Sequence, residues 1–158
     1  MMISPGGIDQ KNWTSAGKQF GDAKRGFDQL RASGAVGFVE LGGDRALLEQ
    51  VESFAAKARG RFDDVVILGI GGSALGPIAL RTALRPSGWN MLDDKARGGF
   101  PRLQVLDNVD PETIAALLGR LKIDRTLFIV TSKSGGTAET MAQFLIVNDR
   151  IASAKLLR

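Results

Sequence analysis

An uninterrupted run of aliphatic residues, Val65 to Leu68, is the clearest feature of the hydrophobic pattern. A run without polar alternation is typical of a strand in a parallel sheet, buried on both faces. Glycines follow at 69, 71 and 72, and then the pattern predicts a helix from Ser73 to about Leu84. We expect Ser73 to cap this helix and Pro77 to lie in its first turn, where a missing N–H costs little.

The same sequence of strand, turn and helix is predicted twice more downstream. Short apolar runs at 103–106 and 126–131 indicate strands, and Asp110-Pro111 is a strong helix start. Strands that alternate with helices imply parallel pairing through right-handed crossovers, so the predicted fold class is α/β, a doubly wound parallel sheet flanked by helices. The apolar positions that we expect to face the core from the last two helices are Ile114, Leu117, Leu118, Leu121, Met141, Phe144, Leu145 and Val147.

The first part of the chain carries a different, purely helical pattern. Apolar residues at three- and four-residue steps predict a helix over 9–32, and Asp44 is expected to cap a second helix that ends near Gly60. A short extended piece is predicted at 38–41 between them. We therefore expect residues 1–60 to be an N-terminal helical segment that packs on the core, and residues 61–158 to form the α/β domain.

Composition narrows the possible chemistry. The 158 residues are 44% hydrophobic, enough for one sizeable core, and the net charge of +4 is spread along the chain. The absence of cysteine and histidine excludes thiol chemistry and removes the commonest general base and metal ligand. We expect no metal site. No apolar run reaches the roughly 20 residues that cross a bilayer. We expect a cytoplasmic protein that binds neither nucleic acid nor membrane.

Two glycine-containing turns are the candidate ligand-binding segments, one after Leu68 and one after Thr131. Both follow strand ends, so both should face the crevice beyond the carboxyl edge of the sheet. The second turn, SKSGGTAET at 132–140, gathers hydroxyl groups and one lysine at a helix start, a combination suited to a phosphate. The alternative is a plain helix cap by Ser134 or Thr137 with Glu139 in the first turn.

A nucleotide site is a competing interpretation of the first turn. Gly69, Gly71 and Ala74 fit the spacing of the dinucleotide-binding fingerprint. However, Asp107, at the end of the next strand, lies much further on than the roughly 20 residues expected for a ribose-binding carboxylate. Neither turn fits a P-loop, because Lys133 precedes its glycines.

The stretches GIGGSALGP at 69–77 and SKSGGTAET at 132–140, with NVDP at 108–111 between them, closely resemble the glucose-6-phosphate isomerase family, specifically its first sugar-isomerase (SIS) domain. The resemblance implies an SIS-type, flavodoxin-like fold and a sugar-phosphate ligand. Ala138 departs from the family pattern, which often has glutamine there. By motif position, Ser132, Lys133, Ser134, Thr137 and Thr140 would bind the phosphate, and Gly72 and Ser73 would line the sugar end.

The resemblance also implies what this chain lacks. The family moves a proton between C1 and C2 of the sugar with a glutamate base, and it uses a histidine, a lysine and an arginine that lie beyond the matched region. We therefore expect no catalytic residue and no cofactor here: the chain would be the N-terminal part of a longer enzyme that is homodimeric when whole. Its uncovered surface should be apolar and favour self-association. A non-catalytic SIS module that senses phosphosugars is the alternative, and a dinucleotide-binding domain the third.

Overall fold

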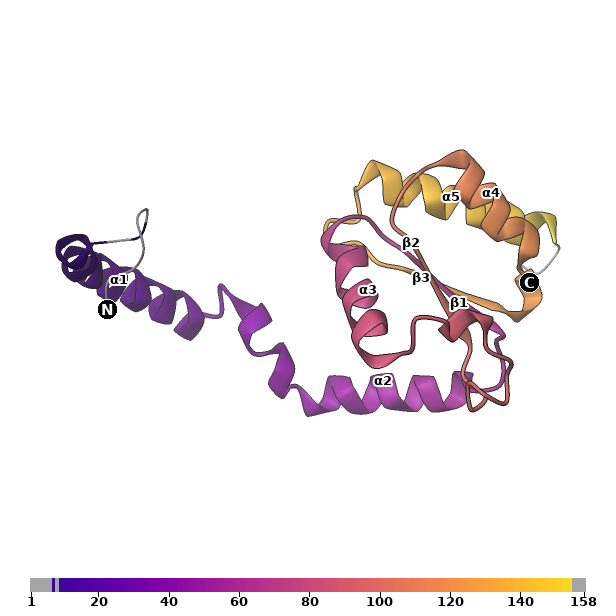
Figure 1. The fold of residues 1–158 in the computed structure, drawn as a ribbon, viewed down its shortest axis with the longest axis horizontal. Helices are drawn as coiled ribbons and strands as arrows, with labels where there is room; N and C mark the ends of the chain where they lie inside the picture. The colour runs from indigo at the N-terminus through magenta and orange to yellow at the C-terminus, as the bar shows by residue number, and fades with distance from the viewer. Residues whose placement is uncertain (1–6, 8, 155–158) are drawn as a thin grey trace. The chain divides into compact units, whose positions relative to one another are not determined.

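The computed structural model describes residue 7 and residues 9–154. The chain divides into two compact units, residues 1–51 and 52–158, which are treated separately below. Figure 1 shows the fold of both. Among the described residues, no helix is long and apolar enough to span a membrane. The predicted packing of residues 1–60 on the core remains a prediction.

The N-terminal unit is helical, as its pattern predicts. Helix α1 (Gln10–Ala32) begins at Asp9, whose side chain accepts a hydrogen bond from the Asn12 N–H at 2.8 Å. Helix α2 (Arg45–Ala58), which continues into the second unit from residue 52, starts after Asp44, whose side chain accepts a hydrogen bond from the Leu47 N–H at 2.9 Å. Both predicted helices and the Asp44 cap are confirmed.

The extended piece predicted at 38–41 is wrong. Two 3₁₀ turns, η1 (Gly37–Val39) and η2 (Leu41–Gly43), occupy this stretch. Their backbone N–H groups bond three residues back, with Val39 N donating to Val36 O at 3.1 Å. A short apolar run forms a strand only where a second strand accepts its hydrogen bonds, and no strand of the described chain pairs with this one.

The second unit alternates strands and helices, which confirms the predicted α/β class. Its sheet is parallel with the order β2-β1-β3, so β1 lies in the centre. The register places Asp64 beside both Arg102 and Thr126. The elements are β1 (Asp64–Leu68), α3 (Gly72–Leu84), η3 (Trp89–Met91), β2 (Arg102–Leu106), α4 (Pro111–Arg120), η4 (Ile123–Arg125), β3 (Thr126–Val130) and α5 (Ala138–Ser153).

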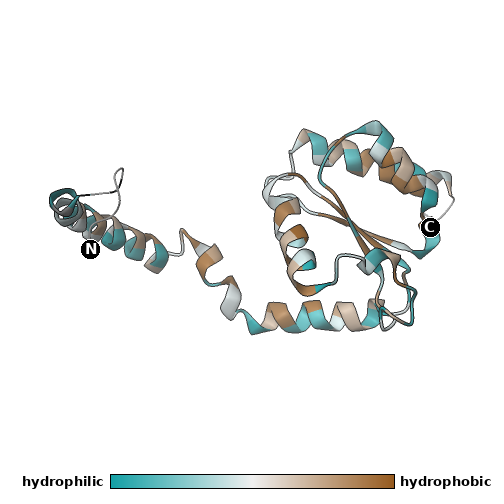
Figure 2. Cartoon of the chain, in the orientation of Figure 1, coloured by the Kyte–Doolittle hydropathy of each residue, from teal (hydrophilic) through white to brown (hydrophobic). Residues whose placement is uncertain are grey.

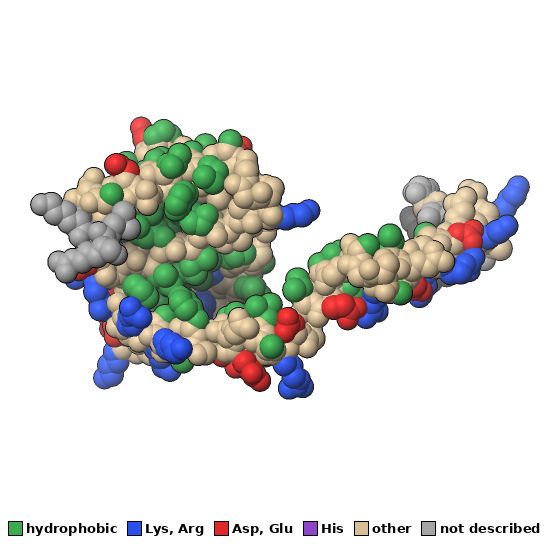
Figure 3. All heavy atoms as spheres, turned by 180° about the vertical axis from the view of Figure 1, so that it is seen from behind, with side chains coloured by type: hydrophobic (Ala, Val, Ile, Leu, Met, Phe, Trp, Pro, Cys, Tyr) green, Lys and Arg blue, Asp and Glu red, His purple; other side chains and the backbone are tan. Residues whose placement is uncertain are grey.

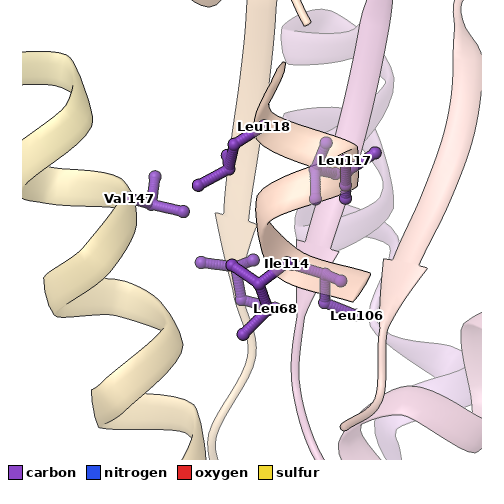
Figure 4. Close-up of a cluster of buried hydrophobic side chains, with 7 residues drawn as sticks. Leu68, Leu106, Ile114, Leu117, Leu118 and Val147 are labelled. Atoms are coloured by element: carbon purple, nitrogen blue, oxygen red, sulfur yellow. The ribbon is translucent and has the colours of Figure 1, made fainter. Parts of the chain in front are cut away.

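Helices cover both faces of this sheet, with α3 on one side and α4 and α5 on the other (Figure 1). The main core lies on the α4 and α5 side (Figure 4). Val66 and Leu68 of β1 are fully buried in it, whereas Val65 and Ile67 are only half-buried. The prediction of a strand buried on both faces is therefore confirmed fully on the α4 and α5 side and only in part on the other. The buried members of the core cluster are Val66, Leu68, Leu106, Ile114, Leu117, Leu118 and Val147.

Helix α5 buries a different face from the predicted one. Met141, Phe144 and Leu145 are 38%, 37% and 59% exposed, so the prediction that they face the core is wrong. Thr140, Gln143 and Val147 form the buried face instead. They are three and four residues apart, as one helix face requires. Figure 2 shows apolar residues along the strands and mixed residues on the helices.

Two neighbouring aspartates join the amino ends of all three strands. Asp64 accepts two hydrogen bonds from the Arg102 guanidinium, at 2.8 and 2.6 Å. Asp63, just before β1, accepts from Arg125, just before β3, at 2.6 Å. The hydrogen bond from Arg125 lowers the pKa of the Asp63 carboxyl. Each aspartate thus ties the central strand to a different neighbour.

Candidate functional site

The two glycine turns leave the sheet side by side. Leu68 and Val130, the last residues of β1 and β3, are partners in the register. The Thr131 N–H donates to Leu68 O at 2.8 Å, one residue beyond β3. The chain passes from β1 to β2 on one side and returns across β1 to β3 on the other, so these ends flank the point where strand order reverses. The predicted meeting of the two turns at one edge is confirmed.

The first turn is compact because glycines permit it. A Cβ at Gly69 would lie 3.0 Å from the Ser73 Cβ and 3.2 Å from its carbonyl, closer than side chains normally pack. Gly71 has φ +56°, a left-handed conformation that favours glycine. With this geometry the Ser73 N–H bonds to Ile70 O at 3.2 Å and α3 begins at Gly72.

Two details predicted for this turn are wrong. Ser73 does not cap α3: the cap residue is Gly71, and among the described residues no side chain bonds to that helix start. Pro77 lies in the second turn of α3 and not in the first. Since proline has no N–H, the Ser73 carbonyl four residues earlier receives no helical hydrogen bond.

The second turn is organised by its own serines. The Ser132 hydroxyl oxygen accepts a hydrogen bond from the Gly135 N–H at 2.9 Å, and Ser134 accepts from Gly136 at 3.2 Å. Gly135 adopts φ +71°, which completes the bend. In both contacts the hydroxyl is the acceptor, so its own proton is available for a further acceptor such as a phosphate oxygen.

Helix α5 begins directly after this turn without a side-chain cap. Thr137 is its cap residue, and within the described chain no side-chain hydrogen bond closes this helix start. Thr137 thus holds the cap position and Glu139 lies in the first turn, as the alternative has them, but the side-chain hydrogen bond of a helix cap is not formed within the described chain. Lys133 is exposed, whereas Thr140 is 2% exposed, so its hydroxyl faces the interior and its N–H lies at the helix start.

Helix α4, unlike α5, begins with a side-chain cap. The Asp110 side chain accepts from the Thr113 N–H at 2.8 Å, and Pro111 and Glu112 follow in the first turn, as predicted. Hydrogen bonding to Thr113 lowers the pKa of Asp110. A side-chain carboxylate thus already accepts a hydrogen bond at the start of α4, whereas among the described residues no side chain caps the starts of α3 and α5, which flank the switch point.

Gln143 is a buried residue near this edge that sequence reasoning missed. It is 1% exposed on α5, and its Nε2 donates to the carbonyls of Leu106 and Asn108 at 3.1 and 3.0 Å. Gln143 therefore anchors the loop after β2 to the helix that carries the second turn. A glutamine amid a helical pattern resembles a solvated position, and only its spacing to Thr140 and Val147 could have indicated otherwise.

A separate hollow of about 510 Å³ lies at the other edge of the sheet. Asp64 and Arg102 line it, together with Asn90 and Arg120. Because Asp64 and Arg102 begin their strands, this hollow is distant in the fold from the two glycine turns, which follow strand ends.

A parallel sheet with helices on both faces, and with two glycine turns at its switch point, defines a doubly wound α/β protein, the class of fold in which ligands bind beyond the carboxyl edge of the sheet. The sequence profile of the phosphoglucose isomerase family matches residues 43–156. The chain therefore belongs to the phosphoglucose isomerase family. This confirms the resemblance drawn from the two turns.

Individual relatives agree with this assignment. A glucose-6-phosphate isomerase of Carboxydothermus hydrogenoformans is 41% identical over 84% of this chain and 28% of its own length. A solved structure, the hypothetical protein TT0462 from Thermus thermophilus, superposes with a TM-score of 0.69 at 34% identity, covering 86% of this chain and 30% of that one. The structure of a glucose-6-phosphate isomerase from Chlamydia trachomatis superposes with a TM-score of 0.53 at 31% sequence identity, covering 65% of this chain and 18% of that one. The chain spans less than a third of these proteins.

Proposed function

We propose that this chain is the sugar-phosphate-binding part of a glucose-6-phosphate isomerase, which interconverts glucose 6-phosphate and fructose 6-phosphate in glycolysis and gluconeogenesis. Its family membership and the names of its relatives support the reaction. The whole protein would be a homodimer. The main support for ligand binding is the pair of helix starts without a side-chain cap at the switch point. A hydroxyl-rich turn leads into one of them.

In this proposal the phosphate occupies the turn before α5. Its oxygens accept hydrogen bonds from the hydroxyls of Ser132, Ser134 and Thr137, and the helix start adds backbone N–H groups and a positive dipole end. Lys133 supplies its main chain and a positive charge. Thr140 contributes its backbone N–H, since its side chain is buried.

The sugar end lies toward the first turn. Gly72 has no side chain, so the backbone can approach the sugar closely. Ser73 offers a half-buried hydroxyl. A sugar hydroxyl can exchange a hydrogen bond with this serine hydroxyl. This turn therefore recognises the sugar while the other holds the phosphate.

We further propose that the chain alone binds this ligand without isomerising it. Isomerisation needs a base that moves a proton between C1 and C2 and an acid that opens the sugar ring. The chain contains no histidine. Glu139, the acid within the second motif, lies in the first turn of α5, where a carboxylate is favoured by the helix dipole.

The proposal is tested by titrating ¹⁵N-labelled chain with fructose 6-phosphate, 6-phosphogluconate and NAD. We expect both sugar phosphates to shift the amide signals of residues 132–140 and 71–73, and inorganic phosphate to shift only the former. Binding of NAD without any effect of the sugar phosphates would refute the proposal and favour a dinucleotide site. Isomerase activity of the isolated chain would refute the non-catalytic role.

Removing single hydroxyls measures the phosphate site directly. Ser132→Ala and Thr137→Ala should each weaken sugar-phosphate binding by about 1–3 kcal/mol, the scale of a hydrogen bond to a charged group. Ser87→Ala and Thr82→Ala remove the same groups from exposed positions outside the turns and should leave affinity unchanged. Unchanged affinity in both turn variants would place the phosphate elsewhere.

A further inference from the structure

The carbonyl group of Leu106, the last residue of β2, accepts hydrogen bonds from two separate segments. The Gly69 N–H, at the start of the first glycine turn, donates to it at 3.2 Å. Gln143 Nε2, on the helix that follows the second turn, donates to it at 3.1 Å. Leu106 is also the register partner of Leu68, which precedes the first turn. One acceptor therefore joins the first turn to α5.

The same amide holds the loop after β2. The Nε2 of Gln143 also donates to the carbonyl of Asn108 at 3.0 Å. Thr137, the cap residue of α5, lies six residues before Gln143, which is about 9 Å along the axis of one continuous helix. On the other side of the second turn, the Thr131 N–H donates to Leu68 O at 2.8 Å. These hydrogen bonds and the helix thus form a closed circuit that runs through both turns.

The two carbonyls fix the orientation of the Gln143 amide. The residue is 1% exposed, and its Oε1 has no hydrogen-bond partner among the described residues. The reversed amide would place this oxygen against two carbonyl oxygens, which have no proton to donate. Gln143 thus keeps its donors on the end of β2, even though a buried acceptor of this kind lowers stability.

The stability of the fold depends little on this amide. Without it, Leu106 O keeps the hydrogen bond from Gly69, and Asn108 is exposed, so its carbonyl can bond to water. An apolar side chain of similar volume would still fill the space between α5 and the sheet. Such a side chain would not hold α5 at a fixed position relative to the loop and the first turn.

We propose that Gln143 is a positioning residue of the sugar-phosphate site, which sets the separation of the two glycine turns so that one ligand reaches both. The identity of the ligand rests on the proposed function, whereas the linkage rests on the contacts described above. Gln143 itself does not touch the ligand. Inorganic phosphate needs only the second turn, but a sugar phosphate spans both, so only the sugar phosphate depends on their separation.

The variant Gln143→Met conserves the volume of the side chain and removes its amide. In calorimetric titrations we expect its affinity for fructose 6-phosphate to fall by at least about tenfold and that for inorganic phosphate by less than about twofold. Val147→Ala is the matched control, since Val147 lies on the same buried face of α5 and is 2% exposed. It should lower the urea midpoint but leave the ratio of the two affinities unchanged. The fluorescence of the buried Trp89 verifies that each variant is folded.

Distances between spin labels test the linkage without any ligand. The chain contains no cysteine, so two introduced cysteines carry the only labels. Figure 3 shows apolar side chains on the surface of the unit that contains the sheet. Leu80 of α3 and Leu145 of α5 are 63% and 59% exposed, and their helices cover opposite faces of the sheet. With Leu80→Cys and Leu145→Cys labelled, Gln143→Met should broaden the distance distribution more than Val147→Ala does.

Three results would overturn the proposal. The first is a distance distribution that Gln143→Met leaves unchanged. The second is an equal loss of affinity for fructose 6-phosphate and inorganic phosphate in Gln143→Met, which would mean that Gln143 acts on the second turn alone. The third is the same selective loss in Val147→Ala, which would assign the effect to the packing of α5. An unaltered chain that binds neither ligand would refute the proposed function, and the spin-label distances would then decide the role of Gln143 by themselves.

Discussion

Replacing Asp64 should destabilise the sheet-containing unit far more than replacing its neighbour Asp63. Asp64 is the first residue of the central strand, and its side chain is 4% exposed, against 38% for its partner Arg102. The Asp64 hydrogen bond raises the pKa of Arg102 above its ordinary value. Asp63 and Arg125 form the same kind of pair with 32% and 42% exposure. Burial of the carboxylate is therefore the main difference between the two pairs.

The expected loss of unfolding free energy in Asp64→Ala follows from the burial of its carboxylate. Breaking a fully buried pair by removing one partner costs about 3–5 kcal/mol, whereas an exposed pair contributes about 0–1 kcal/mol. Arg102 reaches water over part of its surface, so the freed guanidinium is partly solvated. We expect Asp64→Ala to lower the free energy of unfolding by about 2 kcal/mol. At about 4 °C per kcal/mol, this loss lowers Tm by roughly 8 °C. Asp63→Ala should cost clearly less.

Urea unfolding followed by tryptophan fluorescence measures both variants. The chain has two tryptophans, of which Trp89 is 8% exposed and Trp13 is 61% exposed. In a Trp13→Phe background the signal reports only the unit that contains the sheet. Equal losses for Asp64→Ala and Asp63→Ala, or a loss below about 0.5 kcal/mol for Asp64→Ala, would show that burial does not decide the strength of these pairs.

Three further predictions concern other parts of this unit. Since Arg125 lowers the pKa of Asp63, the pair stabilises the fold above the ordinary aspartate pKa of about 3.9 and loses this as pH falls through the lower, folded-state value. Unfolding midpoints measured from pH 7 to pH 2 should therefore fall less steeply in Asp63→Asn than in the parent. Gly69→Ala puts a Cβ 3.0 Å from that of Ser73, so calorimetry should show lower stability and weaker sugar-phosphate binding, and unchanged values would refute the tight turn. Leu68→Ala empties a fully buried position in the core and should cost about 2–5 kcal/mol in urea unfolding, and a loss under about 1 kcal/mol would contradict that burial.

Local chemistry explains most of what the sequence predicted correctly. Asp9, Asp44 and Asp110 begin helices because a carboxylate accepts the unpaired N–H groups at a helix start, a rule that acts within three residues. The strand at 65–68 was recognisable because few other structures bury an uninterrupted aliphatic run. The alternation of elements then led to the parallel, doubly wound class.

The misassigned features depend on residues far away in the chain. The stretch at 38–41 has an apolar pattern, but no strand among the described residues pairs with it. Hydropathy placed Met141, Phe144 and Leu145 in the core, yet α5 is rotated so that Gln143 reaches the carbonyls of the loop after β2. A pattern of apolar residues cannot predict a polar contact with a loop 35 residues away in the chain.

For the candidate site too, local features follow from the sequence, whereas their arrangement follows from the tertiary structure. The sequence by itself determined its ingredients: two glycine turns, the hydroxyls at 132, 134 and 137, and Lys133, at the ends of two strands. Only the tertiary structure decided that β1 and β3 are neighbours, so that both turns leave the sheet together. It also decided that Gly71, and not Ser73, is the cap residue of α3, and that the Asn90 amide closes the outer edge of β2 at Leu103. The physical reason is that caps and turns depend on atoms a few residues apart, whereas strand order, edge closure and helix rotation depend on which distant surfaces pack together.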